Sequence, residues 1–230
     1  MNLIIFLKKC KNSYLTPRIN SLNFKKFYEK NSFFIKVLAK IFWFIPNNFQ
    51  SKYWINAHNV GHGYDKFVEM DDLGCMIVDK IKEYSAKEDK ILDICCNVGR
   101  ILNQLNNHGY KKLYGFDINQ EAINKSKFIF SGLNSAQLEC ASAEEYLKKT
   151  NDNFYDVSYS LGASLEVIPA HFNLIKDINR ITKKYFICLI SENGHAYPRF
   201  WRNEFKRSCF SIIECINVGS SRTLFVLEKK

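Results

Sequence analysis

The 230-residue sequence predicts an α/β protein: a doubly wound sheet, mostly parallel with an antiparallel last strand, and helices on both faces. From Lys90 onward, short β-branched runs alternate with amphipathic stretches of about ten residues, a pattern typical of crossover units. The chain then ends in two strand-like runs with no helix between them. Its 47% apolar and 24% charged residues are ordinary for a folded protein, so collagen and disorder are excluded.

The expected elements begin with a helix over 70–84, packed in front of the first strand, because its apolar residues recur at helical spacing. The closing hairpin is expected over 210–216 and 223–228. The parallel strands are expected over 90–94, 113–117, 137–140, 155–160 and 185–190, and the helices that connect them over 100–107, 119–130, 143–149 and 172–181.

The basic charge of the chain is concentrated at the N-terminus. Residues 1–60 carry nine lysines and one arginine against a single acid, Glu29, which is a net +9 of the formal +10. The rest of the chain is almost neutral and lacks the basic stripe typical of nucleic-acid-binding proteins. We therefore expect a basic, apolar extension over 1–60 and one domain over 61–230, and nucleic acid is not expected as a partner.

Within this extension, residues 33–46 (FFIKVLAKIFWFIP) are apolar except for Lys36 and Lys40. The run is shorter than the roughly 20 residues that a membrane-spanning helix needs. Three interpretations stay open: a lid packed on the main domain, a segment that binds a partner or lies on the membrane surface, where lysines attract anionic headgroups, or a contact with RNA. The membrane-surface interpretation predicts peripheral membrane contact through residues 1–50.

The cysteines indicate the compartment. None of the eight stands in a CxxC pair, and several lie in apolar runs, where a free thiol behaves as a small hydrophobe. The short apolar run at residues 3–7 is followed by its lysines, the reverse of a secretory signal. We expect a cytoplasmic protein, with the inner membrane face as its peripheral location.

The strongest functional signal is a pair of acids at strand ends. Asp93 leaves the first strand before a turn of small residues, and Asp117 ends the second strand. In a doubly wound sheet the ligand site lies beyond the carboxyl ends of the strands. A carboxylate there can accept two hydrogen bonds from a ribose diol, so the pair predicts a nucleoside site.

These residues belong to segments that resemble a known family, the class I methyltransferases that use S-adenosylmethionine. The stretch ILDICCNVGRILNQLNNHGYKKLYGFDINQEAI (91–123) is similar to the first two motifs of the family, and NFYDVSYSLGASLEVIP (153–169) to its fourth. The resemblance covers roughly residues 53–230 and implies a Rossmann-like fold, with the terminal hairpin as the reversed last strand. It is specific for fold and cofactor and weak for substrate.

The resemblance also implies a cofactor site, position by position. Asp93 and the turn with Cys95, Asn97 and Gly99 would face the methionine end, and Asp117 would hold the ribose. At Cys95 and Asn97 the family mostly has glycine, and the Cys95 side chain would intrude where backbone approaches the cofactor. Ile118 would lie on the adenine, Ser142 and Ala143 at its edge, and Ser160 and Leu161 beside the transferable methyl group.

The acceptor is less constrained by the sequence. The layout resembles bacterial methyltransferases, some of which act on glycan sugars, which implies O-methylation of a saccharide or of another small or lipid-linked acceptor. A hydroxyl acceptor needs a general base, and Glu166 and His195 are the candidates because they follow the fourth and fifth strands. A degenerate binding protein that has lost turnover through Cys95 stays open, as does an RNA methyltransferase.

Two other chemistries are weakly indicated. Gly162, Ser164 and Glu166 fall one residue short of the G-x-S-x-G elbow of hydrolases, with Asp177 and His195 following in suitable order. A glutamate at the fifth position would crowd a turn built for glycine. His58 and His62 stand four apart, but no third ligand is evident, so we expect no metal site.

Overall fold

The computed structural model describes residues 49–168, 172–191, 199–219 and 222–230. The hypotheses for residues 1–48, including the apolar run 33–46, lie outside this part of the chain, and so does His195. The described residues contain no helix with the length and apolarity that crossing a membrane requires.

A seven-stranded sheet forms the centre of the protein, in the order β3-β2-β1-β4-β5-β7-β6. Five strands are parallel, whereas β7 runs antiparallel to β5, and β6 antiparallel to β7. This topology confirms the predicted fold class. The strands are β1 (Ile91–Ile94), β2 (Leu113–Asp117), β3 (Gln137–Cys140), β4 (Tyr155–Ser160), β5 (Thr182–Ser191), β6 (Phe210–Asn217) and β7 (Arg222–Lys229).

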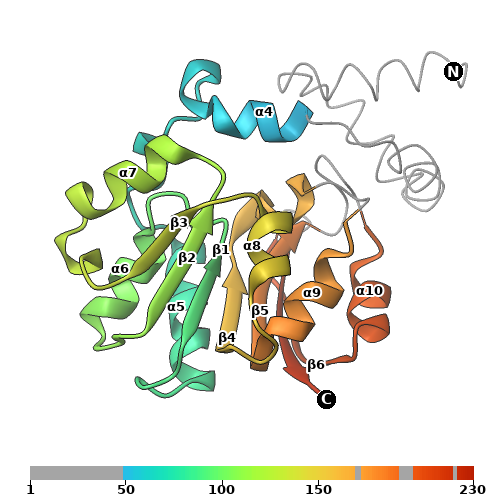
Figure 1. Cartoon of the computed structure of the whole chain (residues 1–230). Helices are drawn as coiled ribbons and strands as arrows, with labels where there is room; N and C mark the ends of the chain where they lie inside the picture. The colour runs from blue at the N-terminus through green and yellow to red at the C-terminus, as the bar shows by residue number, and fades with distance from the viewer. Residues whose placement is uncertain (1–48, 169–171, 192–198, 220–221) are drawn as a thin grey trace, which may run out of the picture.

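Helices cover both faces of the sheet, as Figure 1 shows. One layer holds α5 (Asp72–Tyr84), α6 (Arg100–Asn107) and α7 (Gln120–Ile129), and the other holds α8 (Ala143–Lys149), α9 (Leu174–Ile181) and α10 (Trp201–Arg207). Another helix, α4 (Phe49–Ile55), precedes the short 3-10 helices η1 (Ala57–Val60) and η2 (Tyr64–Phe67), while η3 (Ser131–Leu133) and η4 (Gly162–Val167) follow α7 and β4.

The alternation of side chains along β5 explains why both layers are needed. Phe186, Cys188 and Ile190 pack into the core on the side of α8, α9 and α10, while Ile187 and Leu189 pack on the side of α5 and α6. All five are at most 1% exposed. Full burial of such an apolar side chain contributes about 1.5–3 kcal/mol, so a strand apolar on both faces is stable only between two helical layers.

Capping residues set helix starts that differ from those expected. The Asp71 carboxylate accepts a hydrogen bond from the Gly74 N–H at 2.7 Å, so α5 begins at Asp72 rather than at 70. The Asn119 side chain caps α7 in the same way, at 3.1 Å from the Ala122 nitrogen. The expected range 172–181 was also too long for α9, and that of β5, 185–190, too short.

The carboxyl ends of the parallel strands meet at one edge of the sheet, and the antiparallel β7 brings its first residue to that edge. Ser191, the last residue of β5, pairs with Arg222, the first residue of β7. In Figure 1 helix α4 lies across this edge, above the tips of the strands. The fold therefore gathers strand ends, the start of β7 and α4 around one region.

Candidate functional site

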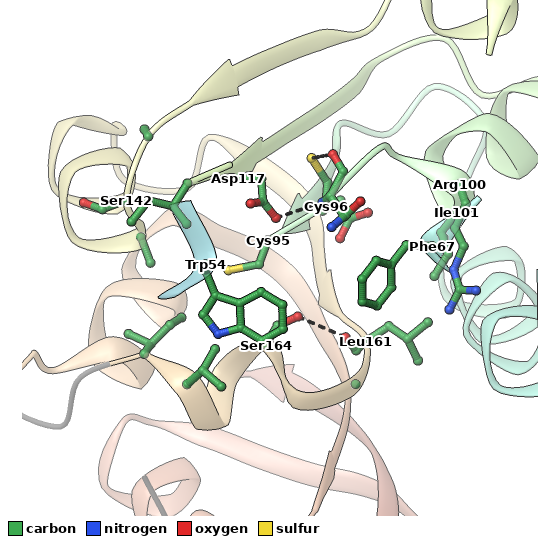
Figure 2. A pocket seen from close by; sticks show the side chains of 18 of the residues that line it. Trp54, Phe67, Cys95, Cys96, Arg100, Ile101, Asp117, Ser142, Leu161 and Ser164 are labelled. Carbon is green, nitrogen blue, oxygen red and sulfur yellow. Dashed lines mark hydrogen bonds between the residues drawn. The ribbon is translucent and has the colours of Figure 1, made fainter. Parts of the chain in front are cut away.

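A cavity of about 530 Å³ opens at this edge (Figure 2), within the range typical of small-molecule sites. Strand ends and the turns after them form one side, and α4, η2 and η4 form the other. Its lining comprises Ser51, Trp54, Phe67, Asp71, Leu73, Asp93, Cys95, Cys96, Asn97, Arg100, Ile101, Asp117, Ile118, Ala141, Ser142, Ala143, Glu144, Leu161, Gly162, Ser164, Val167, Ile168, Phe172 and Arg222.

The turn between β1 and α6 has an unusual backbone. Cys95, Asn97 and Gly99 all adopt left-handed conformations, with φ of 62°, 51° and 78°. A glycine is required at the third position, since a Cβ atom on Gly99 would lie 2.9 Å from the Leu133 Cδ1 atom. The first two positions keep a glycine-like backbone without glycine, which costs of order 1–3 kcal/mol per residue. The turn therefore has a backbone that favours glycine at two positions where the sequence has cysteine and asparagine.

Asp117 fixes the same turn from β2. One carboxylate oxygen accepts a hydrogen bond from the Asn97 N–H at 2.9 Å, and the other accepts one from the Asn119 N–H at 2.8 Å. Burial raises the pKa of this carboxyl above its ordinary value, although these backbone hydrogen bonds oppose the shift. Each carboxylate oxygen keeps a second lone pair, so Asp117 can still accept from hydroxyl groups in the cavity.

Asp93 ends β1 beside a tyrosine. The Tyr159 hydroxyl donates a hydrogen bond to its carboxylate at 2.8 Å, and the residue is 5% exposed. Burial raises the pKa of Asp93 to about 7, and the neighbouring charge of Asp117 raises it further, while the Tyr159 hydrogen bond opposes the rise. Two carboxyl groups therefore meet at neighbouring strand ends, where a cationic ligand would be stabilised.

The Cys95 side chain projects into the cavity (Figure 2), as the resemblance implied. Burial raises the pKa of its thiol well above the ordinary value, and the charges of Asp117 and Asp93 act in the same direction. A thiol held neutral is a poor nucleophile. Cys95 is thus a small apolar obstacle in the cavity.

The other residues assigned to the cofactor divide into two groups. Ile118, Ser142, Ala143 and Leu161 line the cavity with Asp93, Cys95, Asn97 and Asp117. Ser142 also forms a capping box with Glu145 at the start of α8. Gly99 and Ser160 do not belong to the described lining: Gly99 packs behind the turn, and the fully buried Ser160 hydroxyl donates to the Ile94 carbonyl at 3.3 Å.

Glu166, the candidate base within the described residues, lies on η4 behind this lining. Its side chain is fully buried, and Oε1 accepts a hydrogen bond from the Ser191 N–H at 2.6 Å. Oε2 has no hydrogen-bond partner. Burial raises the pKa of Glu166 to about 7, and the charge of Arg222 works against that rise. Its neighbours Val167 and Ile168 line the cavity, whereas the carboxylate does not.

The described residues do not form the arrangements that a hydrolase or a metal site would need. Ser164 donates to the Leu161 carbonyl at 3.0 Å, and Asp177 forms an ion pair with Arg180 at 3.3 Å. The His62 Nδ1 atom bonds the Tyr53 hydroxyl at 2.7 Å. Across the described ranges, no three His, Cys, Asp or Glu side chains are grouped so that they could hold a metal ion.

Sequence reasoning missed several lining residues. Of the three aromatic residues Tyr53, Trp54 and Tyr64, which precede the first helix of the domain, only Trp54 is in the described lining. Phe67 and Arg222 were not expected. A signal for Arg222 existed, because the first residue of an antiparallel last strand must lie at the carboxyl edge of the parallel strands.

Comparison with known proteins finds a similar family. Residues 91–185, less than half of the chain, match the family model described as a methyltransferase domain. The matched segment runs from β1 into β5 and so contains both acids and the left-handed turn. No curated protein matches the chain.

Solved structures with the same fold are distant in sequence. A SAM-dependent methyltransferase from Aquifex aeolicus has a TM-score of 0.59 at 15% identity, covering 73% of this chain and 97% of its own. A TehB-like SAM-dependent methyltransferase from Corynebacterium glutamicum has a TM-score of 0.56 at 18% identity, covering 78% and 95%. The [4+2]-cyclase SpnF has a TM-score of 0.57 at 11% identity, covering 67% and 80%. The fold alone therefore does not fix the reaction.

The cavity fits the cofactor of this family. The carboxyl groups of Asp93 and Asp117 suit a sulfonium cation and a ribose, and Ile118 and Ala143 offer apolar contacts for a base. The methyltransferase domain together with this fold supports a methyltransferase that uses S-adenosylmethionine, which confirms the predicted enzyme class and cofactor.

Proposed function

We propose that this methyltransferase transfers the methyl group of S-adenosylmethionine to a hydroxyl oxygen of a saccharide or of another small or lipid-linked acceptor. The observation that carries the proposal is that one cavity holds both the predicted cofactor residues and an apolar and aromatic wall formed by Trp54, Phe67 and Ile168. An aromatic face suits the apolar face of a sugar ring. Helix α4 covers the opening, which favours a small acceptor over a nucleic-acid duplex.

In this proposal the chain contributes mainly orientation and the exclusion of water. When bound, S-adenosylmethionine supplies an activated methyl group on a positively charged sulfur. The acceptor oxygen would attack this methyl group in line with the bond to sulfur. Holding the two reactants at near-attack distance contributes about 7–11 kcal/mol. Asp117 would fix the ribose, and the Asp93 carboxylate would favour the cation. The apolar wall would keep water out of the cavity.

A hydroxyl acceptor must also lose a proton. Glu166 has a pKa of about 7 and a carboxylate oxygen without a hydrogen-bond partner, both of which suit a general base. Since the buried carboxylate is not part of the cavity lining, it would act through a water molecule or after a side-chain rotation. His195, the second candidate, lies outside the described residues, and its role as a general base stays a hypothesis.

The test begins with calorimetry of S-adenosylhomocysteine binding to the full chain. Acceptors then follow: uncharged sugars, sugar phosphates, lipid-linked sugars and RNA are incubated with S-adenosylmethionine, and methylated products are detected by mass spectrometry. A sugar product supports the proposal. A methylated RNA, lost when the salt concentration is raised, would support the RNA alternative. Cofactor binding without transfer to any acceptor would support a degenerate binding protein.

We further propose that the N-terminal extension keeps this enzyme at the inner membrane face. The net charge of +9 in residues 1–60 and the apolar run 33–46 support surface binding to anionic lipids. A lipid-linked acceptor would then be reached where it is anchored.

A further inference from the structure

Arg222 places a positive charge at the cavity, on the far side from the two acids. It begins β7, and its pairing with Ser191 of β5 sets it at the carboxyl edge of the parallel strands. Its side chain contributes to the lining of the cavity. In the sheet order, β7 is separated from β1, which carries Asp93, by β4 and β5. Arg222 is thus separated from the two acids by at least two strands of the sheet.

The two arginines in the lining differ in the hydrogen bonds and ion pairs that they form. Arg100 pairs with the Asp71 carboxylate at 3.1 Å and also donates to the Glu69 carbonyl. The Arg222 guanidinium has no hydrogen bond or ion pair with any described residue, although its charge lowers the pKa of the nearby Glu166. Arg222 is therefore the cavity cation whose donors are available to a ligand among the residues that the structure describes.

A second donor without a partner lies in the same cavity. The Trp54 indole projects into it (Figure 2), and its Nε1 atom is buried without an acceptor. An indole N–H can only donate, and leaving such a donor unsatisfied costs about 1–3 kcal/mol. A ligand that brings an oxygen acceptor to this place would remove that cost.

We infer that the methyl acceptor carries an oxyanion, a carboxylate or a phosphate, which Arg222 binds where β7 reaches the cavity, with the Trp54 N–H as a further donor. The planar guanidinium of arginine suits both groups because it can donate two parallel hydrogen bonds. The inference rests on the proposed function and narrows it: the acceptor would be an acidic sugar or a sugar phosphate, including the phosphate of a lipid-linked sugar.

The experiment measures sugar binding to the full chain saturated with S-adenosylhomocysteine. Glucose, glucose 6-phosphate and glucuronate are titrated by calorimetry. We expect at least one charged sugar to bind about tenfold more tightly than glucose, the effect of one charge-assisted hydrogen bond. The stronger of the two charged sugars identifies phosphate or carboxylate as the group recognised.

Three variants assign the preference to residues. Arg222→Gln should abolish the preference for the charged sugar, and Trp54→Phe should weaken its binding several-fold while keeping the aromatic ring. Arg207→Gln, which removes an exposed arginine of α10 outside the cavity lining, should leave the preference unchanged. Equal binding of all three sugars, no binding of any, or a preference that persists in Arg222→Gln would overturn the inference.

The design separates this inference from the proposed function. Failure to bind S-adenosylhomocysteine counts against the proposed function alone, because the sugars can be titrated into cofactor-free protein with the same variants. Cofactor binding without a preference for a charged sugar counts against the oxyanion site alone.

Discussion

The two sides of the cavity are built in different ways. The cofactor side comes from consecutive strand ends, and its polar groups are engaged with each other or with backbone: Asp117 with two N–H groups and Asp93 with Tyr159. The opposite side comes from segments far apart in the sequence, and there the Trp54 N–H and the Glu166 Oε2 atom have no hydrogen-bond partners. A cofactor used in every turnover fits the preorganised side, and a variable acceptor fits the other.

The largest expected effect is a loss of cofactor affinity, caused by removing a carboxylate from the preorganised side of the cavity. Asp117→Ala leaves the Asn97 and Asn119 N–H groups without their acceptor and removes the ribose contact. Each hydrogen bond to a charged group contributes about 1.5–3 kcal/mol, so the affinity for S-adenosylhomocysteine should fall by at least about 100-fold. Calorimetry measures it, with the exposed Glu121→Ala as control. Unchanged affinity in Asp117→Ala would contradict the cofactor assignment.

The next effect concerns the stability of the same side and its pH dependence. Asp93 titrates near pH 7 in the folded state against an ordinary value of 3.8, so the folded protein holds a proton that the unfolded chain releases between these values. The free energy of unfolding therefore falls as pH rises from about 4 through 7, and Glu166 adds a contribution of the same sign.

Asp93→Asn should remove its share of this pH dependence. We expect the cofactor-free variant to be more stable than wild type at pH 8 by about 1–3 kcal/mol, with a flatter profile between pH 5 and about 7.5. Urea unfolding at several pH values measures both quantities. Asp79→Asn, at an exposed position of α5, is the control. A variant less stable than wild type at pH 8 would show that the ionised Asp93 carboxylate does not destabilise the folded state.

A smaller effect on cofactor affinity is expected when the Cys95 side chain is removed from the cofactor side of the cavity. Cys95→Gly removes a side chain from the cavity and suits a φ of 62°, so the affinity for S-adenosylhomocysteine should rise several-fold. Stability should change by no more than about 1 kcal/mol, because relief of strain is offset by the greater freedom of the unfolded chain. Cys209→Gly is a matched control: its φ is 61°, but it is exposed and outside the cavity lining. A rise in affinity in both variants, or in neither, would refute the obstruction.

The smallest effect on the site is expected from the N-terminal extension. Replacing Lys36 and Lys40 by glutamate should lower binding to vesicles of anionic lipid by at least about tenfold, since each lysine near such a surface contributes about 1 kcal/mol. The affinity for S-adenosylhomocysteine should change by less than about twofold, because the cofactor contacts lie in the domain. Sedimentation with vesicles and calorimetry measure the two quantities. Vesicle binding that survives the double substitution would contradict a role for these lysines, and a wild-type chain that does not bind vesicles would favour a packed lid.

Sequence reasoning worked best where structure is local. Strand β2 was predicted with the bounds that the structure has, and so were α6 and α8, because each is a short periodic run between clear turn signals. Helix α10 was missed because its seven residues bury only Trp201 and Phe205, too few to produce a periodic pattern. The left-handed backbone of Cys95 and Asn97 was not predicted either, since side-chain identity there argues against it.

By itself, the sequence determined the order of strands and helices and the acids at the ends of β1 and β2, which predict a nucleoside site, while the resemblance to a known family supplied the cofactor class. These features follow from neighbours along the chain, where periodicity and turn chemistry act. Only the tertiary structure decided what faces the acids: it brought α4 over the strand ends and, through antiparallel pairing, Arg222 to the same edge. It also buried Glu166 behind the lining. Contacts between segments that are distant along the chain depend on how layers pack, which periodicity and turn chemistry within one segment do not determine.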